Sequence, residues 1–468
     1  MRKLEFLGII GIISLFCGAT AISSAAQTFN TVANFDFTNG SAPNAALIQG
    51  TDGNFYGTTL LGGSSDSCTD GCGTVFKVTP SGTLTTLHNF DGTDGSSATG
   101  VIQGTDGNFY GTTANGGASN ICSNGCGTVF KITQSGTLTT LHNFNGTDGS
   151  GPYTGLIQGS DGNFYGTTAY GGTNDNCTNG CGTVFKITAS GTLTTLYSFD
   201  VAHGSGPNAL VQGTDGNFYG TTFSGGTLSN GLVFKITAKG TLTILHSFEG
   251  SDGSGPSSGL IQATDGNFYG ATYEGGPTGN GDGTIYKITA KGTLTTLHSF
   301  DYADGDAPAG LVQATDGNFY GTTQDGGNAF FGTVFQMTAK SALTTLHNFD
   351  DYDGADPQSA PMQATNGNFY GTAAMAGSGG YGAVFSLSMG IGPFVETNPA
   401  SGKVGTAVTI LGNNLAGATS VTFHGKKATF KASSTYITTT VPSGATTGTV
   451  EVVTPNNTLK SKMAFRVP

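Results

Sequence analysis

Tryptophan is absent from this chain of 468 residues, and Lys and Arg together number only 17 against 29 Asp and Glu. A surface that binds nucleic acid needs clustered basic side chains, so no nucleic-acid partner is expected. Hydrophobic residues make up only 36% of the chain while 79 positions are Gly, so a large helical core is not expected either. H-E-x-x-H pairs and phosphate-binding loops are also missing, which leaves metalloprotease and nucleotide-hydrolase chemistry without a sequence signature.

Long apolar runs are missing beyond the first residues of the chain. The single one, "LGIIGIISLFCGATA", follows the basic start "MRK" and precedes the small residues "SSAAQ". The run is too short for a membrane-spanning helix, and the three parts together predict a signal peptide over residues 1–26, cleaved after Ala26. We therefore expect a secreted or cell-surface chain with no membrane insertion.

One nine-residue phrase recurs through most of the chain. "TDGNFYGTT" begins at residue 51, and close copies begin at 105, 160, 214, 264, 315 and 365. Each unit contains four short segments rich in β-branched and aromatic residues, separated by Gly, Asp and Ser turns: "LIQGT", "NFYGTT", "GTVFKVT" and "TLTTLHNF". Nothing in them has a helical period. Four strands in each period of 50 to 55 residues predict the blades of a β-propeller.

The count of predicted strands indicates how the propeller closes. The last third-strand segment, "AVFSLSM" at 383–389, is followed by no fourth strand, whereas "TFNTVANFDFTNGSAPNA" at 28–45 aligns with residues 192–209, which include a fourth strand. Pairing this N-terminal strand with the last three removes two open sheet edges. We predict an all-β fold with a seven-bladed propeller over residues 27–390, its last blade completed by the N-terminal strand.

The repeat stops near residue 391. Residues 391–468 alternate β-branched residues with Gly, Asn and Ser turns, which predicts a small immunoglobulin-like β-sandwich. The run "NPASGKVGTAVTILGNNL" and the segments after it closely resemble the IPT/TIG group of immunoglobulin-like domains, which usually serve as spacers or binding modules. The chain ends in the last expected strand of this domain, so we expect no sorting tail.

The repeat units resemble a second family. "DGNFYGTT", the glycine pair after it, "GTVFKIT" and "GTLTTLHNF" are similar to the GloVer tandem repeat of exported bacterial proteins over residues 28–389. This resemblance implies an exported repeat protein and brings no established activity with it.

Six cysteines remain once Cys17 leaves with the signal peptide. They form three C-x3-C pairs in the same loop of the first three units: Cys68 with Cys72, Cys122 with Cys126, and Cys177 with Cys181. An even count in an exported chain indicates disulfides. Equivalent loops of neighbouring blades should lie too far apart for a bond that needs Cα atoms within about 7 Å, so pairing inside each loop is predicted. The alternative is a thiol redox or zinc site, but zinc needs about four ligands, and no His lies near these pairs.

Histidines and acidic turns are the other candidate site residues. Five of the seven His occupy one position of the fourth strand and are expected to be structural: His88, His142, His246, His298 and His347. His424 lies in the sandwich, and His203 stands alone in a turn, where we interpret it as a turn substitution. The acidic turns give weak calcium candidates, because hard cations prefer carboxylates: Asp301, Asp304, Asp306, Asp351, Asp353 and Asp356. Ordinary tight turns also favour Asp and Gly, and the Glu that ends an EF-hand loop is missing, so no metal or other cofactor is predicted.

The repeated design favours binding over catalysis. A catalytic site needs a unique set of converging groups, whereas these units offer the same groups seven times and their single acidic or basic residues are scattered in turns: His203, Glu249, Glu274 and Asp282. Repeated loops suit multivalent recognition, and the "NFYG" aromatics Phe55 and Tyr56 are expected in the blade core. We expect a monomeric, non-catalytic binding protein for an extracellular glycan or protein. An extracellular carbohydrate-active hydrolase or lyase is the alternative.

Overall fold

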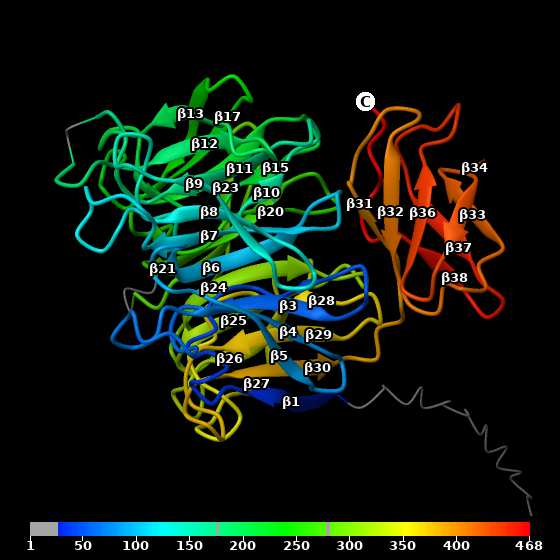
Figure 1. Cartoon of the computed structure of the whole chain (residues 1–468), viewed down its shortest axis with the longest axis horizontal. Coiled ribbons are helices and arrows are strands. Elements are labelled where there is room, and N and C mark those ends of the chain that lie inside the picture. The colour runs from blue at the N-terminus through cyan, green and yellow to red at the C-terminus, as the bar shows by residue number, and fades with distance from the viewer. Residues whose placement is uncertain (1–26, 175–176, 278–280) are drawn as a thin grey trace, which may run out of the picture.

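The computed structural model describes residues 27–174, 177–277 and 281–468. These residues form a ring of β-sheets with a smaller β-sandwich beside it (Figure 1). The predicted signal peptide, residues 1–26, lies outside the described residues. No helix in the described ranges is long and apolar enough to cross a lipid bilayer.

Six blades of the ring follow one another along the chain, each written here from its innermost strand outward. Blade 1 consists of β2 (Ile48–Gln49), β3 (Phe55–Thr59), β4 (Thr74–Val78) and β5 (Leu84–Asn89). Blade 2 consists of β6 (Ser96–Gln103), β7 (Phe109–Asn115), β8 (Thr128–Ile132) and β9 (Leu138–Asn143). Blade 3 consists of β10 (Ile157–Gln158), β11 (Phe164–Thr168), β12 (Thr183–Ile187) and β13 (Leu193–Ser198). Blade 4 has an inner strand in two pieces, β14 (Ser205–Pro207) and β15 (Val211–Gln212), then β16 (Phe218–Ser224), β17 (Leu232–Ile236) and β18 (Leu242–Ser247). Blade 5 is built in the same way from β19 (Ser254–Pro256), β20 (Ile261–Gln262), β21 (Phe268–Glu274), β22 (Thr284–Ile288) and β23 (Leu294–Ser299). Blade 6 consists of β24 (Asp306–Gln313), β25 (Phe319–Asp325), β26 (Thr333–Met337) and β27 (Leu343–Asn348).

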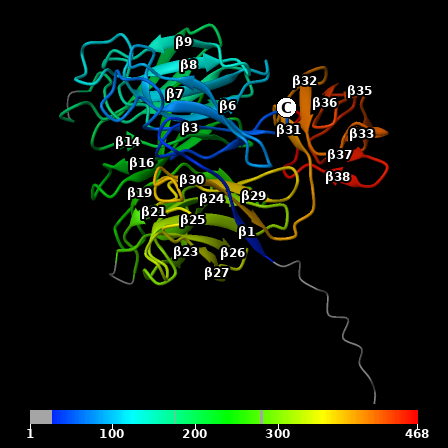
Figure 2. The same ribbon diagram turned by 60° about the horizontal axis from the view of Figure 1, so that its bottom comes forward.

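Blade 7 joins the two ends of the ring. Its strands are β28 (Met362–Gln363), β29 (Phe369–Ala373), β30 (Ala383–Ser388) and β1 (Thr28–Asn34). Strand β1 is antiparallel to β30, with Thr28 opposite Ser388 and Asn34 opposite Ala383. Figure 2 shows the dark blue β1 beside the yellow and orange strands of this blade. The predictions of an all-β fold, a seven-bladed propeller and closure by the N-terminal strand are confirmed.

Aromatic rings hold neighbouring blades together. The Tyr of each "NFYG" segment packs against the Phe of the same segment in the next blade, as with Tyr56 and Phe109, whose ring centroids are 4.1 Å apart. The contact that closes the ring joins Tyr370 to Phe55 at 4.0 Å. Phe55 and Tyr56 have no exposed surface, which confirms that these aromatics belong to the core. The phrase recurs because every blade boundary needs the same pair of rings.

The glycine between the aromatics and the threonines is required by packing. A Cβ atom on Gly57 would lie 2.6 Å from Cζ of Phe76 and 2.8 Å from Cδ2 of Leu47. Phe76 belongs to the third strand, and its ring covers this part of the second strand. Only glycine leaves room for that ring.

The tyrosine hydroxyls and the preceding turns form a second repeated element. Tyr110 donates a hydrogen bond to Asp106 at 2.8 Å, and Asn108 donates its side-chain amide to the same carboxylate at 2.7 Å. Burial alone would raise the pKa of Asp106, but these hydrogen bonds outweigh it and hold that pKa below the usual range. Burial, together with the hydrogen bond to Asp106, raises the pKa of Tyr110.

A closed circuit of hydrogen bonds runs round the inner strands. The backbone N–H of Thr51 donates to Oε1 of Gln103 in the next blade at 2.9 Å. The equivalent bond recurs at each boundary, and the last one joins Thr365 to Gln49 at 2.9 Å across the chain ends. The glutamines that accept these bonds are Gln103, Gln158, Gln212, Gln262, Gln313, Gln363 and Gln49. The boundary between blades 7 and 1 therefore has the same hydrogen bond as the other six boundaries.

The C-terminal sandwich has two sheets packed over one core. The first sheet contains β31 (Glu396–Asn398), β32 (Ala407–Leu411), β36 (Tyr436–Thr440) and β35 (Phe430–Ala432). The second contains β34 (Lys426–Lys427), β33 (Ser420–Phe423), β37 (Val450–Val453) and β38 (Thr458–Lys460). Their core includes Ile410, Ile437, Val421 and Val452, each at most 1% exposed.

The sandwich lies against one end of the ring. Thr435 donates a hydrogen bond to the carbonyl of Thr51 at 2.7 Å, and Asn413 donates to Oγ1 of Thr365 at 2.7 Å. Both acceptors belong to turns between first and second strands. A propeller ring surrounds a central channel. The sandwich covers the end of this channel where these turns lie, and leaves the other end free (Figure 1).

Candidate functional site

The free end of the ring carries the long connections. They are the loops between the second and third strands of each blade and the links from each fourth strand to the next blade, and we call the surface they form the loop face. Backbone bonds join the two kinds of connection: Gly117 in a loop of blade 2 donates to Gly92 in the preceding link at 2.9 Å. The glycine pair after each "NFYGTT" segment makes this contact possible, because both Gly116 and Gly117 have positive φ, at 74° and 84°.

Three of these loops are closed by disulfides. Cys68 is bonded to Cys72, Cys122 to Cys126, and Cys177 to Cys181. Each bond stays inside one loop, so the predicted pairing is confirmed and these thiols are not free for a redox or zinc site. Intrachain disulfides are typical of exported proteins.

A cavity in the loop face lies between the loops of blades 2 and 3. It has a volume of about 600 Å³ and is lined by side chains that include Ile121, Tyr153, Tyr170, Asn124 and Asn174. The two tyrosine rings meet edge to face with centroids 6.0 Å apart. The tyrosine rings can stack on a flat apolar group of a ligand, and the asparagine amides can form hydrogen bonds to its hydroxyl or amide groups.

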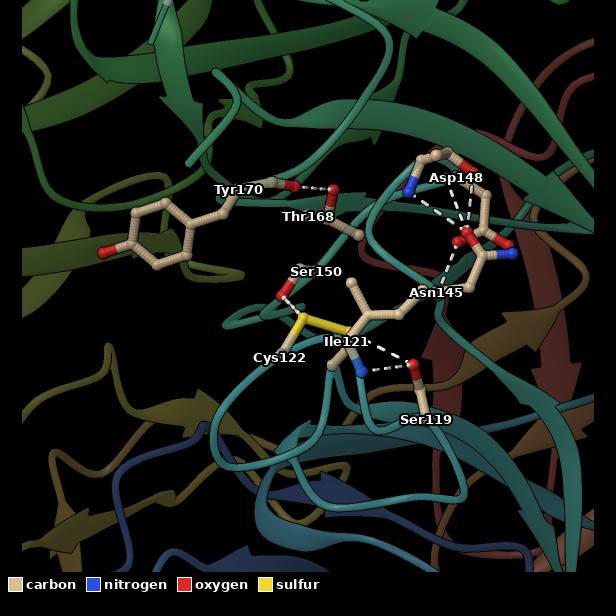
Figure 3. Close-up of a disulfide and its surroundings, with 10 residues drawn as sticks. Ser119, Ile121, Cys122, Asn145, Asp148, Ser150, Thr168 and Tyr170 are labelled. Carbon is tan, nitrogen blue, oxygen red and sulfur yellow. Dashed lines mark hydrogen bonds between the residues drawn. A yellow bond between two sulfur atoms is a disulfide. The ribbon is translucent and has the colours of Figure 1, made fainter. Parts of the chain in front are cut away.

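The disulfide of blade 2 forms one wall of this cavity. Cys122 Sγ lies 3.2 Å from Oγ of Ser150, which belongs to the link between blades 2 and 3. Figure 3 shows Ile121 beside this disulfide and Tyr170 pointing away from it. The disulfide thus fixes the loop that presents Ile121, which is 74% exposed.

The five fourth-strand histidines each contact a carboxylate at the base of the loop face. His88 Nε2 lies 2.7 Å from Asp94, and the other pairs lie within 2.9 Å: His142 with Asp148, His246 with Asp252, His298 with Asp304 and His347 with Asp353. Blade 3 has Tyr197 in place of the His and His203 in place of the Asp, and His203 Nδ1 bonds Asp200 at 2.8 Å instead. In the hydrogen bonds of the described residues, no Ser, Thr or Cys side chain contacts the five rings. The arrangement ties each fourth strand to its following turn and does not form a nucleophile–base pair.

The strand pattern of the sequence predicts a structural role for these histidines but does not identify their partners. The signal was present, because an Asp follows each of the five His after a fixed spacing of six residues. The joint exchange at Tyr197 and His203 is a second sign that the two positions are coupled.

The calcium candidates are distributed over two links of the loop face. Asp304 and Asp353 bond His298 and His347, and their second carboxylate oxygens accept backbone N–H groups of Asp301 and Asp350. Across the described ranges, no group of three or more His, Cys, Asp or Glu is arranged to hold a metal ion. The carboxylates of Asp301, Asp304 and Asp353 therefore accept backbone N–H groups, as in ordinary Asx turns. The carboxylate of Asp356 accepts a hydrogen bond from the side-chain amide of Gln358 at 2.6 Å.

Carboxylates crowd together where blades 5, 6 and 7 meet. Burial raises the pKa of Asp306, and the nearby charges of Asp282, Asp325 and Glu274 raise it further. Burial and Asp325 likewise raise the pKa of Asp356. The two carboxyl groups share two causes, burial first and then the negative charge of Asp325.

Apolar side chains are exposed mainly on the loop face. All of the exposed large apolar residues of the described chain lie on its connections or at the strand ends beside them, except Ile244 and Val404. The loop-face members are Leu61, Ile121, Tyr153, Tyr170, Val201, Phe223, Leu228, Tyr302, Phe330, Phe331, Tyr352, Met375 and Tyr381. The large exposed apolar side chains of the described chain are therefore concentrated on the loop face.

A second cavity lies under the sandwich at the covered end of the channel. It has a volume of about 380 Å³ and is lined by Val211, Ile261 and Val312 of the inner strands together with Glu396 and Lys462 of the sandwich. Burial lowers the pKa of Lys462, while the charge of Glu396 raises it. The sandwich forms part of the wall of this cavity, whereas the loop face lies at the other end of the ring (Figure 1).

The geometry defines a tandem-repeat propeller joined to an immunoglobulin-like sandwich, with its long connections on the loop face. The chain belongs to the Gloeobacter/Verrucomicrobia repeat family, whose model matches residues 19–178 and 170–385. Residues 394–466 match the IPT/TIG domain. Both resemblances noted in the sequence are confirmed.

Solved structures resemble the chain in fold. The extracellular domain of the hybrid two-component system BT4673 from B. thetaiotaomicron is 11% identical with a TM-score of 0.51, over 95% of this chain and 60% of that one. A gluconolactonase from Xanthomonas campestris is 12% identical with a TM-score of 0.41, over 65% of this chain and 88% of that one. A puromycin hydrolase is 10% identical with a TM-score of 0.48, over 80% of this chain and 59% of that one. No curated protein matches the chain. At these identities the likeness concerns the fold alone.

Proposed function

We propose that this chain is an exported, non-catalytic binding protein that presents its loop face to an extracellular glycan or protein. The observation that carries this proposal is the position of the exposed apolar side chains, which gather on the free end of the ring. The sandwich at the other end acts as a spacer or adhesion module. The disulfides and the predicted signal peptide support export, since disulfides persist in oxidising compartments.

The repeated construction supports binding rather than catalysis. Each blade offers the same buried groups, and the His–Asp pairs recur in five blades with no nucleophile hydrogen-bonded to them among the described residues. The loops differ from blade to blade, and the cavity between blades 2 and 3 is one product of those differences. A surface of several weak sites on one rigid ring gains affinity through simultaneous contacts.

The test is binding of the full chain to a glycan array and to a panel of immobilised extracellular proteins. A loop-face variant with Tyr153→Ala, Tyr170→Ala and Tyr352→Ala is compared with a control that carries Ile244→Ala and Val404→Ala, the two exposed apolar residues elsewhere. We expect the loop-face variant to lose the ligand and the control to keep it. A ligand that the loop-face variant retains at full affinity would contradict the proposal. Turnover of chromogenic glycosides by the purified chain would favour the alternative, a carbohydrate-active enzyme.

A further inference from the structure

The two domains of the chain carry opposite charge. Residues 27–390 contain eight Lys against 26 Asp or Glu, a formal charge of −18. Residues 391–468 contain seven Lys or Arg against two Glu, a formal charge of +5. A sandwich with this charge lies at one end of an acidic ring.

The loop face concentrates the negative charge further. The sequence of its loops and links contains no Lys or Arg, because the propeller lysines lie on third strands or in the turns that follow them: Lys77, Lys131, Lys186, Lys235, Lys239, Lys287, Lys291 and Lys340. Apart from the His–Asp pairs, the described residues give no ion pair to the carboxylates of this face. The face therefore presents uncompensated negative charge together with exposed aromatic rings.

One corner of the loop face combines both features most strongly. Tyr302 lies in the link between blades 5 and 6, and its ring stacks on that of Phe330, in a loop of blade 6, with centroids 5.8 Å apart. Tyr352 lies in the link between blades 6 and 7 and is 83% exposed. The exposed carboxylates of Asp301 and Asp351 lie in the same two links. We call these five residues the aromatic–acidic corner.

The backbone at this corner supports a binding role. Tyr302 and Phe330 have φ angles of 60° and 66°, in the left-handed region that bulky residues usually avoid. The carbonyl of Tyr302 accepts a hydrogen bond from Gly327 at 2.8 Å, which helps to hold it there. Two exposed rings are thus held side by side by a strained backbone, and strain of this kind concentrates at functional sites.

The sandwich offers the matching surface. Lys426 and Lys427 form β34 at an edge of the second sheet, Lys431 follows in β35, and all three side chains are exposed. In the described residues the Lys ion pairs are Lys131 with Asp106 and Lys460 with Glu451, so these three lysines have no carboxylate partner within their own chain. The hairpin that contains β33 and β34 lies on the side of the sandwich away from the ring in both views (Figures 1 and 2).

We propose that the aromatic–acidic corner binds the Lys426–Lys427 edge of the sandwich of a second copy of this chain. Lysine ammonium groups lie over Tyr302, Phe330 and Tyr352 and pair with the neighbouring carboxylates, since an aromatic face attracts a cation. The two surfaces belong to opposite ends of one molecule, so in a pair one copy keeps a free sandwich edge and the other keeps a free loop face. A contact of this heterologous type extends into a head-to-tail chain. The inference rests on the proposed function, because it names the partner of the same face.

Sedimentation velocity of the full chain over a range of concentrations and salt provides the test. We expect the average mass to rise with concentration at low salt and to fall back to the monomer at high salt, because exposed charges are screened beyond about 8 Å even at physiological ionic strength. Lys426→Glu with Lys427→Glu should weaken association at least about tenfold, and so should Phe330→Ala with Tyr352→Ala, since a few central aromatic residues often carry most of an interface's affinity. Lys239→Glu with Lys291→Glu changes the net charge equally on another surface and should leave association within about twofold of the parent chain.

A mixing experiment tests the specific pairing. The variant Lys426→Glu with Lys427→Glu keeps an intact loop face, and the variant Asp301→Lys with Asp351→Lys keeps an intact sandwich. Each should be monomeric alone, and an equimolar mixture should associate. Thermal melting confirms that both are folded, since all four side chains are exposed.

Two results would overturn the inference. The first is a parent chain that stays monomeric at every concentration and salt, and the second is association that the reversed charges leave unchanged. If the chain is monomeric while the loop-face variant with Tyr153→Ala, Tyr170→Ala and Tyr352→Ala loses a different ligand, this inference fails and the proposed function stands. If no ligand and no self-association depend on loop-face residues, both fail.

Discussion

Closure of the ring makes a quantitative prediction about Phe35, which follows β1. Phe35 has no exposed surface and packs edge to face on Phe76 of blade 1 at 5.0 Å. Its equivalent in blade 3 is Phe199, also fully buried, which packs on Phe234 at 5.3 Å. The backbone N–H of Phe35 donates to Gly382 at 3.0 Å, and that of Phe199 donates to Gly182 at 2.9 Å. The two phenylalanines thus have matched surroundings, but only Phe35 belongs to a segment that joins its blade from the far end of the chain.

The substitutions Phe35→Ala and Phe199→Ala should therefore cost the same free energy of unfolding. Truncation of a fully buried Phe to Ala costs about 3–5 kcal/mol through lost burial and the cavity left behind. The loss at Phe35 cannot exceed the free energy that holds β1 and its link in blade 7, because the segment can undock and leave the rest of the ring folded. Equal losses of this size show that the closing strand is held by at least that amount.

Guanidinium unfolding followed by far-UV circular dichroism measures both losses, and tyrosine fluorescence gives a second probe in a chain without tryptophan. Deletion of residues 27–40 serves as the limiting case and should lower the melting temperature sharply, since it exposes one edge of β30. Closure as described is refuted if Phe35→Ala leaves the unfolding midpoint unchanged while Phe199→Ala lowers it.

Three further outcomes follow from particular contacts. Cys122→Ser with Cys126→Ser should lower the free energy of unfolding by about 2 kcal/mol, because the disulfide closes a short loop. Added reductant should lower the melting temperature of the parent chain and have less effect on the variant. The pKa of Asp106 is lower in the folded chain than its unfolded value of about 3.9, so the ionised carboxylate stabilises the fold above about pH 3.9, and this stability is lost as the pH falls through the folded pKa. Tyr110→Phe removes one hydrogen bond to this carboxylate, so the free energy of unfolding, measured in urea above and below about pH 3.9, should depend less on pH in the variant. Tyr286→Phe should raise stability by about 1–2 kcal/mol, since the Tyr286 hydroxyl is buried without a hydrogen-bond partner in the described structure; a lower melting temperature would contradict this reasoning.

The ring could be predicted from sequence because its contacts repeat. A pair such as Tyr56 and Phe109 occurs at every boundary, so the period, the strands and the missing fourth strand of blade 7 could all be counted. Pairing within each C-x3-C loop was equally accessible, because distance limits leave few alternatives. The fixed spacing from His88 to Asp94 is also visible in the sequence. It is found only when the His position and the Asp position are compared across all blades, because strand patterns alone do not connect the two positions.

The remaining features depend on contacts that occur once. The hydrogen bond from Asn413 to Thr365 places the sandwich on one end of the channel. Thr365 begins a copy of the repeated phrase, but the repeat does not distinguish it from its six equivalents as the residue that contacts the sandwich. The cavity between Tyr153 and Tyr170 likewise depends on the path of two loops with different sequences. Side-chain directions in such loops follow from local packing, which single-sequence patterns do not determine.

This division between repeated and unique contacts also separates stability from recognition. The Gln–Thr circuit and the Tyr–Phe stacks must be equivalent at all seven boundaries, because a ring closes only if every blade turns the chain by a similar amount. Strand residues are therefore constrained in every blade at once. The loop face is free of that constraint, since its residues contact only one or two neighbouring connections. Substitutions at exposed positions such as Tyr352 can change what the face binds at little cost in stability, whereas the same change at Tyr56 would open a blade boundary.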